Sequence, residues 1–356
     1  MSILSLLVSM ITIKEIAELA KVSTGTVDRV LHNRAGVSKK TAERIKALLK
    51  EHQFKLNDVA SKLANRKKYN LATLLPQFDV KNSFWKSPYL GVLKGKEEVG
   101  FYGVQTSNFH FDQFDAASYV LRFEELMESK PDAVVLAPIF KNETKKIVAQ
   151  LDAADIPYVF LNIDIEGYKN LSYIGQNSVK SGKLAAKLMH LCSNENDEFL
   201  IIKLRKNINN YTALSDRIIG FSSYFDEKKI PMKIHSLTFD SLGNEELISQ
   251  ELKRFMKMNS KIQGIYMPSS QIAALVDCLP NEKLIGLSVI GHDTTERNLE
   301  ALDADKVSFL ISQKSFEQGY DAVSVISDYL LQNKEPKQKI YSPLEIITKE
   351  NIDSKF

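Results

Sequence analysis

Cysteine is scarce in this chain of 356 residues, which carries only Cys192 and Cys278. Two cysteines are too few for a disulfide framework, so a small secreted fold held together by cross-links is excluded. The expected setting is a reducing cytoplasm, in which both residues are ordinary thiols.

Long apolar runs are also missing. The apolar stretch MSILSLLVSMI is shorter than the roughly 18 residues that are read as a membrane span. It has no positively charged start and no small-residue cleavage site, so we expect neither an export signal nor a membrane partner. Met10 is a candidate for the native start, in which case the residues before it are an artefact of the assigned start.

Sequence signatures of catalysis are absent as well. The chain has no nucleophile elbow, no phosphate-binding glycine loop and no Cys-x-x-Cys pair. His292, Asp293 and Glu296 lie close together in the sequence, but their spacing matches no metal-ligand motif. We therefore predict a protein that is not an enzyme and that needs no metal or other cofactor.

Charge is unevenly distributed along the chain. The segment from Ile11 to Lys68 holds 14 basic and 6 acidic residues, whereas the remainder holds 33 basic and 38 acidic residues. A basic head on an acidic body indicates a polyanion partner for the head alone. At roughly 100–200 residues per domain, the length predicts two or three domains.

The basic segment has the periodicity of short helices. In TIKEIAELA the apolar residues recur along one helical face, at Ile13, Ile16, Ala17 and Ala20. Ser23 is a good N-cap, and Val22 and Val27 are spaced to form a hydrophobic staple across it. A second helix should therefore start at about Thr24.

The second helix is expected to bury Val27, Val30 and Leu31, and to expose Thr24, Gly25, Asp28 and Arg29. Val37 and Ser38 repeat the staple and cap before a third helix, whose packing residues are Ala42, Ile45, Leu48 and Leu49. Such an order is typical of a helix-turn-helix, in which the second helix enters the major groove. The alternative is a three-helix bundle with a solvated basic face.

The stretch TIKEIAELAKVSTGTVDRVLHNRAGVSKKTAERI resembles the DNA-binding head of the lactose-repressor (LacI) family of bacterial regulators. The resemblance implies that a head of residues 11–56 binds operator DNA. The contacts that it implies within this head come from Thr12, Ser23, Thr24, Gly25, Thr26, Arg29, Asn33, Ser38, Lys39 and Thr41.

The resemblance extends to a hinge helix and linker at residues 57–68, with Asn57 as the cap, Ala60 at the interface of a pair and Leu63 as a wedge in the minor groove. An apolar wedge unstacks a base step and bends the duplex. The implied state is a homodimer. Asp28 and Gly25 depart from the family pattern, which makes Thr24 and Arg29 the expected base readers, since arginine can bind guanine with two hydrogen bonds.

From Leu71 onwards the pattern changes to short apolar runs, each followed by a longer stretch of helical spacing. The runs include LATLLP, DAVVLAP, PYVFLN, EFLIIKL, IQGIYM and LIGLSVIG. Alternating strands and helices predict α/β architecture with parallel sheets covered on both faces. The number of units favours two lobes, with a cleft beyond the carboxyl ends of the strands.

This body, residues 69–348, resembles the type 1 periplasmic-binding-protein effector and dimerisation domain of the same family. The resemblance rests on YIGQNSVKSGKLAAKLM, DRIIGF, VIGHD and SFLISQKSFEQGYDAV. It implies that the chain crosses between lobes three times, and we expect the crossings near Asn162–Tyr173, Gly291–Thr294 and Ser312–Ser315.

Six residues are candidates for binding a small effector. Phe84 and Trp85 could stack on a sugar ring, although a pair of core aromatics would look the same. Asp164 and Asp293 follow strands, and their carboxylates suit the hydroxyls of a sugar. Asp293 could instead cap the helix that follows it. The remaining two are Arg205, which follows FLIIKL, and Gln313, which ends SFLISQ. Arg217 in DRIIGF is interpreted as a residue that supports the fold.

The sequence therefore predicts a dimeric transcriptional regulator that binds operator DNA under the control of a small molecule, expected to be a sugar or a sugar derivative. Two rival interpretations are a sugar-binding module without a regulatory role and an enzyme on a doubly wound fold. The basic head and the missing export signal argue against the first, and the missing catalytic signatures argue against the second.

Overall fold

The computed structural model describes residues 13–31, 36–51, 68–80, 83–204, 212–240, 242–280 and 284–352. The chain divides into two compact units, residues 1–67 and 68–356, which are called the head and the body. Six predicted site residues lie outside the described residues: Thr12, Asn33, Asn57, Ala60, Leu63 and Arg205. None of the described helices is both long and apolar enough to cross a membrane.

The described residues of the head form three helices, α1 (Ile13–Leu19), α2 (Thr24–Leu31) and α3 (Lys39–Glu51). Ile16, Ala17, Ala20, Val27, Val30 and Ile45 form its buried core. The Ser23 hydroxyl accepts a hydrogen bond from the Thr26 amide, and Ser38 does the same for Thr41, both at 3.2 Å. The predicted caps and the predicted start of α2 are thus confirmed.

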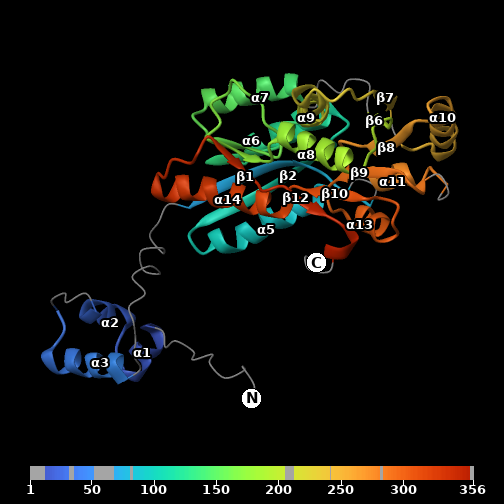
Figure 1. Cartoon of the computed structure of the whole chain (residues 1–356). Helices are drawn as coiled ribbons and strands as arrows, with labels where there is room; N and C mark the ends of the chain where they lie inside the picture. The colour runs from blue at the N-terminus through green and yellow to red at the C-terminus, as the bar shows by residue number, and fades with distance from the viewer. Residues whose placement is uncertain are drawn as a thin grey trace, which may run out of the picture. The chain divides into compact units, whose positions relative to one another are not determined.

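The body is built on two sheets of six strands, which define lobe 1 and lobe 2 (Figure 1). The strand order in lobe 1 is β11-β5-β4-β3-β1-β2 and in lobe 2 it is β12-β10-β9-β8-β6-β7. All described pairings are parallel except that of β10 with β12. The predicted parallel α/β class and two-lobed body are confirmed.

Lobe 1 carries the strands β1 (Tyr69–Pro76), β2 (Val104–Phe111), β3 (Ala133–Leu136), β4 (Tyr158–Leu161), β5 (Ser172–Gly175) and β11 (Lys339–Tyr341). Its helices are α5 (Lys86–Gly100), α6 (Ala116–Glu128), α7 (Lys141–Ala153) and α14 (Ser315–Gln332). The strands β3 and β4 are buried along their whole length, because helices cover both faces of the sheet.

Lobe 2 carries the strands β6 (Glu198–Leu204), β7 (Ile234–Phe239), β8 (Ile262–Tyr266), β9 (Ser288–His292), β10 (Phe309–Ser312) and β12 (Glu345–Ile347). Its helices are α8 (Ser178–Leu191), α9 (Thr212–Lys228), α10 (Glu245–Met258), α11 (Ile272–Val276) and α13 (Glu296–Asp303), and a 3-10 turn follows at Lys349–Asn351. Successive residues of β6 enter different cores: Phe199 and Ile201 pack with α8 and α9, and Leu200 and Ile202 pack on the opposite face.

Two helix pairs pack at glycine contacts, α8 with α9 and α5 with α14. Helices α5 and α14 lie side by side although they are far apart in the sequence (Figure 1). A Cβ atom on Gly91 would collide with the main-chain oxygen of Phe316, and one on Gly319 would collide with that of Pro88. Only glycine permits so close an approach of two helix backbones.

The crossings between lobes correct part of the sequence-based expectation. Among the described residues, the chain passes between the sheets at residues 176–177, 313–314 and 342–344. The expected crossing at Ser312–Ser315 is confirmed, but the one at Gly291–Thr294 is wrong because β9 and β10 pair in the same sheet. The crossing expected at Asn162–Tyr173 comes later, since β5 still pairs with β4 in lobe 1.

Candidate functional site

A cavity of about 420 Å³ lies between the lobes. Its wall residues follow the carboxyl ends of strands in both sheets, as Asn162 follows β4, Asp293 follows β9 and Gln313 follows β10. Ligands bind at this edge in open parallel α/β sheets, because strand ends and helix starts converge there. The cavity is large enough for a small molecule.

Lobe 1 contributes a mainly apolar wall. Phe84, Trp85, Phe114 and Ile139 line it, with Asn162 as a polar residue among them. Trp85 is only 3% exposed and belongs to the core of lobe 1, whereas Phe84 is half-buried. The two rings meet edge to face with centroids 5.3 Å apart. Phe84 therefore offers the accessible ring, and Trp85 mainly supports it.

Lobe 2 contributes a mixed wall, in which polar residues with both signs of charge stand beside apolar residues such as Leu204, Leu214 and Leu242. Arg217, Asp240, Ser269, Gln271, Asp293 and Arg297 line it. Arg297 stands at an exposed position and its Nη2 pairs with Asp277 Oδ2 at 3.0 Å. Two of these groups, Arg217 and Asp293, are almost fully buried, at 4% and 5% exposure. Buried charged groups are costly to desolvate, so their presence in a cavity wall indicates recognition of a polar ligand.

Asp293 has two unusual properties. Its φ of +70° lies in the left-handed region, which aspartate tolerates better than most residues. Burial raises the pKa of its carboxyl, while the Arg217 charge and the hydrogen bond from Gln313 act in the opposite direction. It does not cap the following helix, because Thr295 is the N-cap of α13. The cap interpretation of Asp293 is therefore wrong.

Arg217 is a cavity residue that the sequence interpretation assigned only to the fold. Its Nη1 donates to the main-chain oxygen of Pro268 at 2.5 Å. With its amide oxygen turned toward the guanidinium, Gln176 accepts from Arg217 Nε at 2.9 Å. Gly182 of α8 packs directly on the main chain of Arg217, which fixes this turn of α9. Both roles, supporting the fold and lining the cavity, therefore belong to one residue.

A chain of amide side chains connects the two walls. Asn162 of lobe 1 donates from Nδ2 to Gln313 Oε1 and to Gln318 Oε1, both at 2.9 Å. Gln313 in turn donates from Nε2 to Asp293 Oδ1 at 2.7 Å. All four residues are buried, and Gln313 stands at a crossing between the lobes. The network therefore spans the seam between the lobes at the floor of the cavity.

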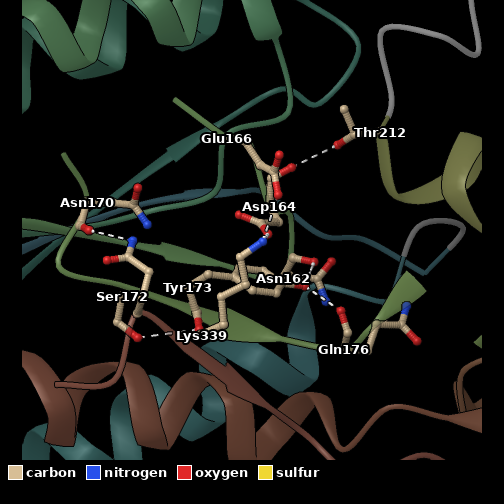
Figure 2. Close-up of polar contacts among 10 residues, drawn as sticks. Asn162, Asp164, Glu166, Asn170, Ser172, Tyr173, Gln176, Thr212 and Lys339 are labelled. Atoms are coloured by element: carbon tan, nitrogen blue, oxygen red, sulfur yellow. Dashed lines mark hydrogen bonds and ion pairs between the residues drawn. The ribbon is translucent and has the colours of Figure 1, made fainter. Parts of the chain in front are cut away.

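Asp164 does not line the cavity, although it stands two residues after Asn162. Its carboxylate pairs with Lys339 Nζ at 2.8 Å, and Lys339 also pairs with Glu166 at 2.9 Å (Figure 2). Its main-chain oxygen accepts from the Thr212 hydroxyl of α9 at 3.2 Å. The structure thus gives Asp164 a place in the seam between the lobes rather than in the cavity wall.

Tyr173 holds the start of the first crossing. Its hydroxyl lies 3.2 Å from the main-chain oxygen of Asn162 and 2.8 Å from that of Gln176 (Figure 2). Burial raises the pKa of this phenol, so it remains a neutral donor. The cavity residue Asn162 and the crossing residue Gln176 are therefore tied to the same side chain.

Metal ligation has no support in this region. His292 is buried and hydrogen-bonds Tyr266 through Nε2 at 2.9 Å. Burial and the nearby Arg217 charge hold the pKa of His292 well below its usual value, so the ring is neutral. Within the residues that the structure describes, no group of three or more His, Cys, Asp and Glu side chains is arranged to hold a metal ion.

The head presents a second candidate surface. Thr24, Gly25 and Arg29 of α2 are exposed, as is Lys39 at the start of α3. The hydroxyls of Ser23 and Thr26 bond each other at 2.9 Å, and those of Ser38 and Thr41 at 2.8 Å. Capping thus occupies the serines and their partners, whereas Thr24 and Arg29 keep exposed side chains.

Comparison with known proteins identifies both units. Residues 74–335 match the family model of the periplasmic binding protein domain. Residues 12–57 match the model of bacterial regulatory proteins of the lacI family. The two matches correspond to the body and to the head.

Two similar proteins span nearly the whole chain, and one solved structure matches about four fifths of it. The ribose operon repressor of Lactococcus lactis is 24% identical over 97% of this chain and 99% of its own length. The regulator MalR of Streptococcus pneumoniae is 22% identical over 94% of this chain and 97% of its own. A Bacteroides fragilis protein assigned to the LacI transcriptional regulators has a crystal structure that matches 82% of this chain and all of its own, with 28% identity and a TM-score of 0.73.

Structures of sugar-binding proteins share the fold of the body. A solute-binding protein from Agrobacterium vitis, solved with α-D-tagatopyranose, gives a TM-score of 0.67 at 19% identity and covers 81% of this chain and 97% of its own. One from Burkholderia graminis, solved with D-arabinose, gives 0.69 at 17% identity, with 81% and 98% covered.

Proposed function

The chain belongs to the periplasmic binding protein domain family and carries a head of the lacI family of bacterial regulatory proteins, and from this premise we propose that it is a transcriptional regulator that binds operator DNA under the control of a sugar. The observation that carries the proposal is the pairing, in one chain, of a basic helix-turn-helix with an interlobe cavity that is aromatic on one wall and polar on the other.

The DNA-binding part of the proposal rests on the head. Its net charge is positive while the rest of the chain is negative. Thr24, Gly25 and Arg29 stand exposed on the first two turns of α2, the end that approaches base edges in a helix-turn-helix. Lys39 and the capped starts of α2 and α3 are suited to phosphate contacts, which position the head without reading sequence.

The sugar part rests on the cavity. Phe84 suits the apolar face of a sugar ring, and Asn162, Arg217, Asp293 and Gln313 suit its hydroxyls. The ribose operon repressor is similar over nearly the whole chain, and the tagatose-bound and arabinose-bound proteins share the fold. We propose no catalytic role, because recognition alone accounts for these residues.

Regulation follows from the position of the cavity. A ligand changes DNA affinity only when it binds one arrangement of the lobes better than another. The cavity has walls from both lobes, so a bound sugar bears on their relative position. We propose that the regulator acts as a homodimer in the cytoplasm, because one helix-turn-helix covers only a half-site.

Sugar binding is tested by thermal shift and calorimetry with D-ribose, D-arabinose, D-tagatose, D-glucose and D-galactose. A ligand at about 100 times its Kd stabilises the folded state by about 2.7 kcal/mol. At least one sugar of the panel is expected to raise the melting temperature and to bind one site per chain. If none of them binds at millimolar concentration, the sugar part of the proposal is contradicted.

DNA binding is tested by selection of bound sequences from a random pool. The enriched sites are expected to be near-palindromes, and log affinity should fall steeply with log salt, by about 0.9 for each phosphate contact. Arg29→Ala should cost about 1–3 kcal/mol on the selected site and relax preference at one base pair. Enrichment of no sequence, or affinity that ignores salt, would contradict the DNA part.

A further inference from the structure

Gln318 on α14 is fully buried and does not line the cavity. Its amide is nevertheless one hydrogen bond away from a cavity residue. Gln318 Oε1 accepts from Asn162 Nδ2 at 2.9 Å, and Gln318 Nε2 donates to the main-chain oxygen of Gln313 at 2.7 Å. The residue therefore touches the chain of amides from behind the cavity floor.

The polarity of this network is set at its two ends, by the main-chain oxygen of Gln313 beside Gln318 and by the Asp293 carboxylate beside the Gln313 side chain. The oxygen and nitrogen of a side-chain amide are similar in size, so their orientation depends on a partner whose role is fixed. The main-chain oxygen of Gln313 is such a partner, because a carbonyl only accepts. It holds the nitrogen of Gln318, and the oxygen of Gln318 must then face Asn162.

The fixed polarity passes from Gln318 to the cavity. Asn162 has to turn its nitrogen toward Gln318 Oε1, and the second proton of that nitrogen bonds Gln313 Oε1 at 2.9 Å. The Gln313 side chain then directs its nitrogen at Asp293 Oδ1, 2.7 Å away. Along the run from Gln318 through Asn162 and Gln313 to Asp293, every contact thus joins a donor to an acceptor.

The consequence at the cavity is a pair of acceptors. Asn162 uses both protons of its amide inside the network, which leaves its Oδ1 as the polar atom that can meet a ligand. Asp293 likewise uses one carboxylate oxygen and keeps the other. Within the described part of the chain, neither remaining oxygen has a hydrogen bond, and both residues line the cavity. The floor therefore favours a ligand that donates hydrogen bonds.

We propose that Gln318 is a positioning residue for ligand specificity: it fixes the orientation of Asn162 so that Asn162 and Asp293 both accept from hydroxyl groups of the ligand. The proposal rests on the proposed function, in which the cavity takes a sugar. Without Gln318, the Asn162 nitrogen keeps a single acceptor, Gln313 Oε1, so its orientation is held less firmly. The floor then distinguishes a donating hydroxyl less sharply from a group that only accepts.

The test compares D-ribose with monofluoro analogues in which fluorine replaces one hydroxyl at a time, measured by calorimetry. Fluorine cannot donate, so the wild type should bind the analogue altered at the floor about tenfold more weakly, the cost of one hydrogen bond. In Gln318→Leu and Gln318→Met this ratio should fall toward one. Ser327→Ala is the matched control, because Ser327 is buried on the same helix and its hydroxyl has no partner within the described residues.

A double-mutant cycle shows whether Gln318 acts through Asn162. The effect of Gln318→Met on the ribose-to-analogue ratio should disappear in an Asn162→Ala background, because the oriented group is then missing. If Gln318→Met weakens the binding of D-ribose and of every analogue by the same factor, Gln318 has a merely structural role and the proposal is overturned. An unchanged ratio in both Gln318 variants would overturn it as well.

A second readout needs no sugar. In protein labelled with ¹⁵N at asparagine and glutamine amides, the side-chain protons of Asn162 and Gln313 should exchange slowly with water in the wild type and in Ser327→Ala. They should exchange at least tenfold faster in Gln318→Met. If no sugar binds the wild type but exchange behaves as stated, the proposed sugar function fails and the oriented network stands. Unchanged exchange overturns the network.

Discussion

The two lobes contribute unlike walls to one cavity. Lobe 1 provides the rings of Phe84, Trp85 and Phe114, whereas lobe 2 provides buried Arg217 and Asp293. Apolar contact adds affinity but discriminates weakly between similar ligands, while buried polar groups reject a ligand that leaves them unpaired. The difference suggests a division of labour in which the aromatic rings of lobe 1 hold any sugar ring, while Asn162 and the polar residues of lobe 2 select among hydroxyl patterns.

The largest effect is expected when the polar wall loses its cation. Arg217→Met should weaken sugar binding by about 100-fold, because hydrogen bonds from a charged group contribute about 1.5–3 kcal/mol each. It should also lower stability, since the main-chain oxygen of Pro268 loses its donor. Calorimetry with the bound sugar measures the first effect. Arg254→Met, at an exposed position of α10, is the matched control. If Arg217→Met and Arg254→Met bind the sugar with equal affinity, the contrast between the two walls is contradicted.

The second effect separates stability from recognition. Asp293→Asn keeps an acceptor for Gln313 and suits the left-handed backbone at this position. It removes a charge that burial disfavours in the folded state, so the ligand-free protein should become more stable at neutral pH. Sugar affinity should nevertheless fall about tenfold, because a neutral acceptor binds a hydroxyl less strongly than a carboxylate does. Denaturation and calorimetry on the same sample measure both; a variant that is less stable and binds normally would contradict this account.

The pH dependence of stability follows from the same carboxyl. Burial raises the pKa of Asp293 above the value of about 3.9 in the unfolded chain, so the folded state binds more protons between these two values. The contribution of this group to stability is therefore present at low pH and is lost as pH rises through the folded pKa. As pH rises across that window, the free energy of unfolding of the wild type should fall relative to that of Asp293→Asn. A difference that does not change with pH would contradict the assignment.

A smaller and more uniform effect is expected at the apolar wall. Phe84→Leu keeps apolar volume but removes the flat ring, and should weaken binding of every sugar that binds by about fivefold, within the 0.5–1.5 kcal/mol that aromatic contacts add. The order of preference among the five sugars of the panel should not change. A reordering would show that the aromatic rings also select, which would break the division of labour.

The smallest effect is expected at Asp164. Asp164→Asn removes one of two partners of Lys339, in a pair that is partly open to solvent, so stability should change by less than about 1 kcal/mol. Sugar affinity should change by less than about twofold, because the carboxylate does not line the cavity. Asn162→Ala is the informative contrast, since it lies two residues away and faces the ligand; the same loss in both variants would place Asp164 in the site.

The pair Asn162 and Asp164 shows what could and could not be predicted from the sequence. The run of apolar residues before them identified β4, and the end of that strand indicated a ligand edge. The choice between the two side chains depended on the course of the loop, whose Asn162 has a φ of +68°. Local polarity favoured the carboxylate, and the structure instead turned it toward Lys339 on β11, far away in the sequence.

The cavity role of Arg217 and two of the three expected crossings were not predicted correctly, for a related reason. The motif DRIIGF marked a packed helix correctly, but only the fold shows that α9 starts beside the cavity and that Gly182 fixes its turn. Crossings depend on which sheet a strand joins, and short strands such as β5 and β11 carry little pattern of their own. By contrast, the caps and the starts of α2 and α3 were predictable, because caps and staples act within a few positions.

The central claim is that a sugar in the cavity controls DNA binding, and the affinity of the full chain for its selected DNA, with and without the bound sugar, tests it most directly. Fluorescence anisotropy at fixed salt should show a change of at least about fivefold at saturating sugar, the low end of allosteric coupling. The change should shrink in Arg217→Met at the same sugar concentration. A sugar that binds the wild type at the cavity and leaves its DNA affinity unchanged would contradict the account.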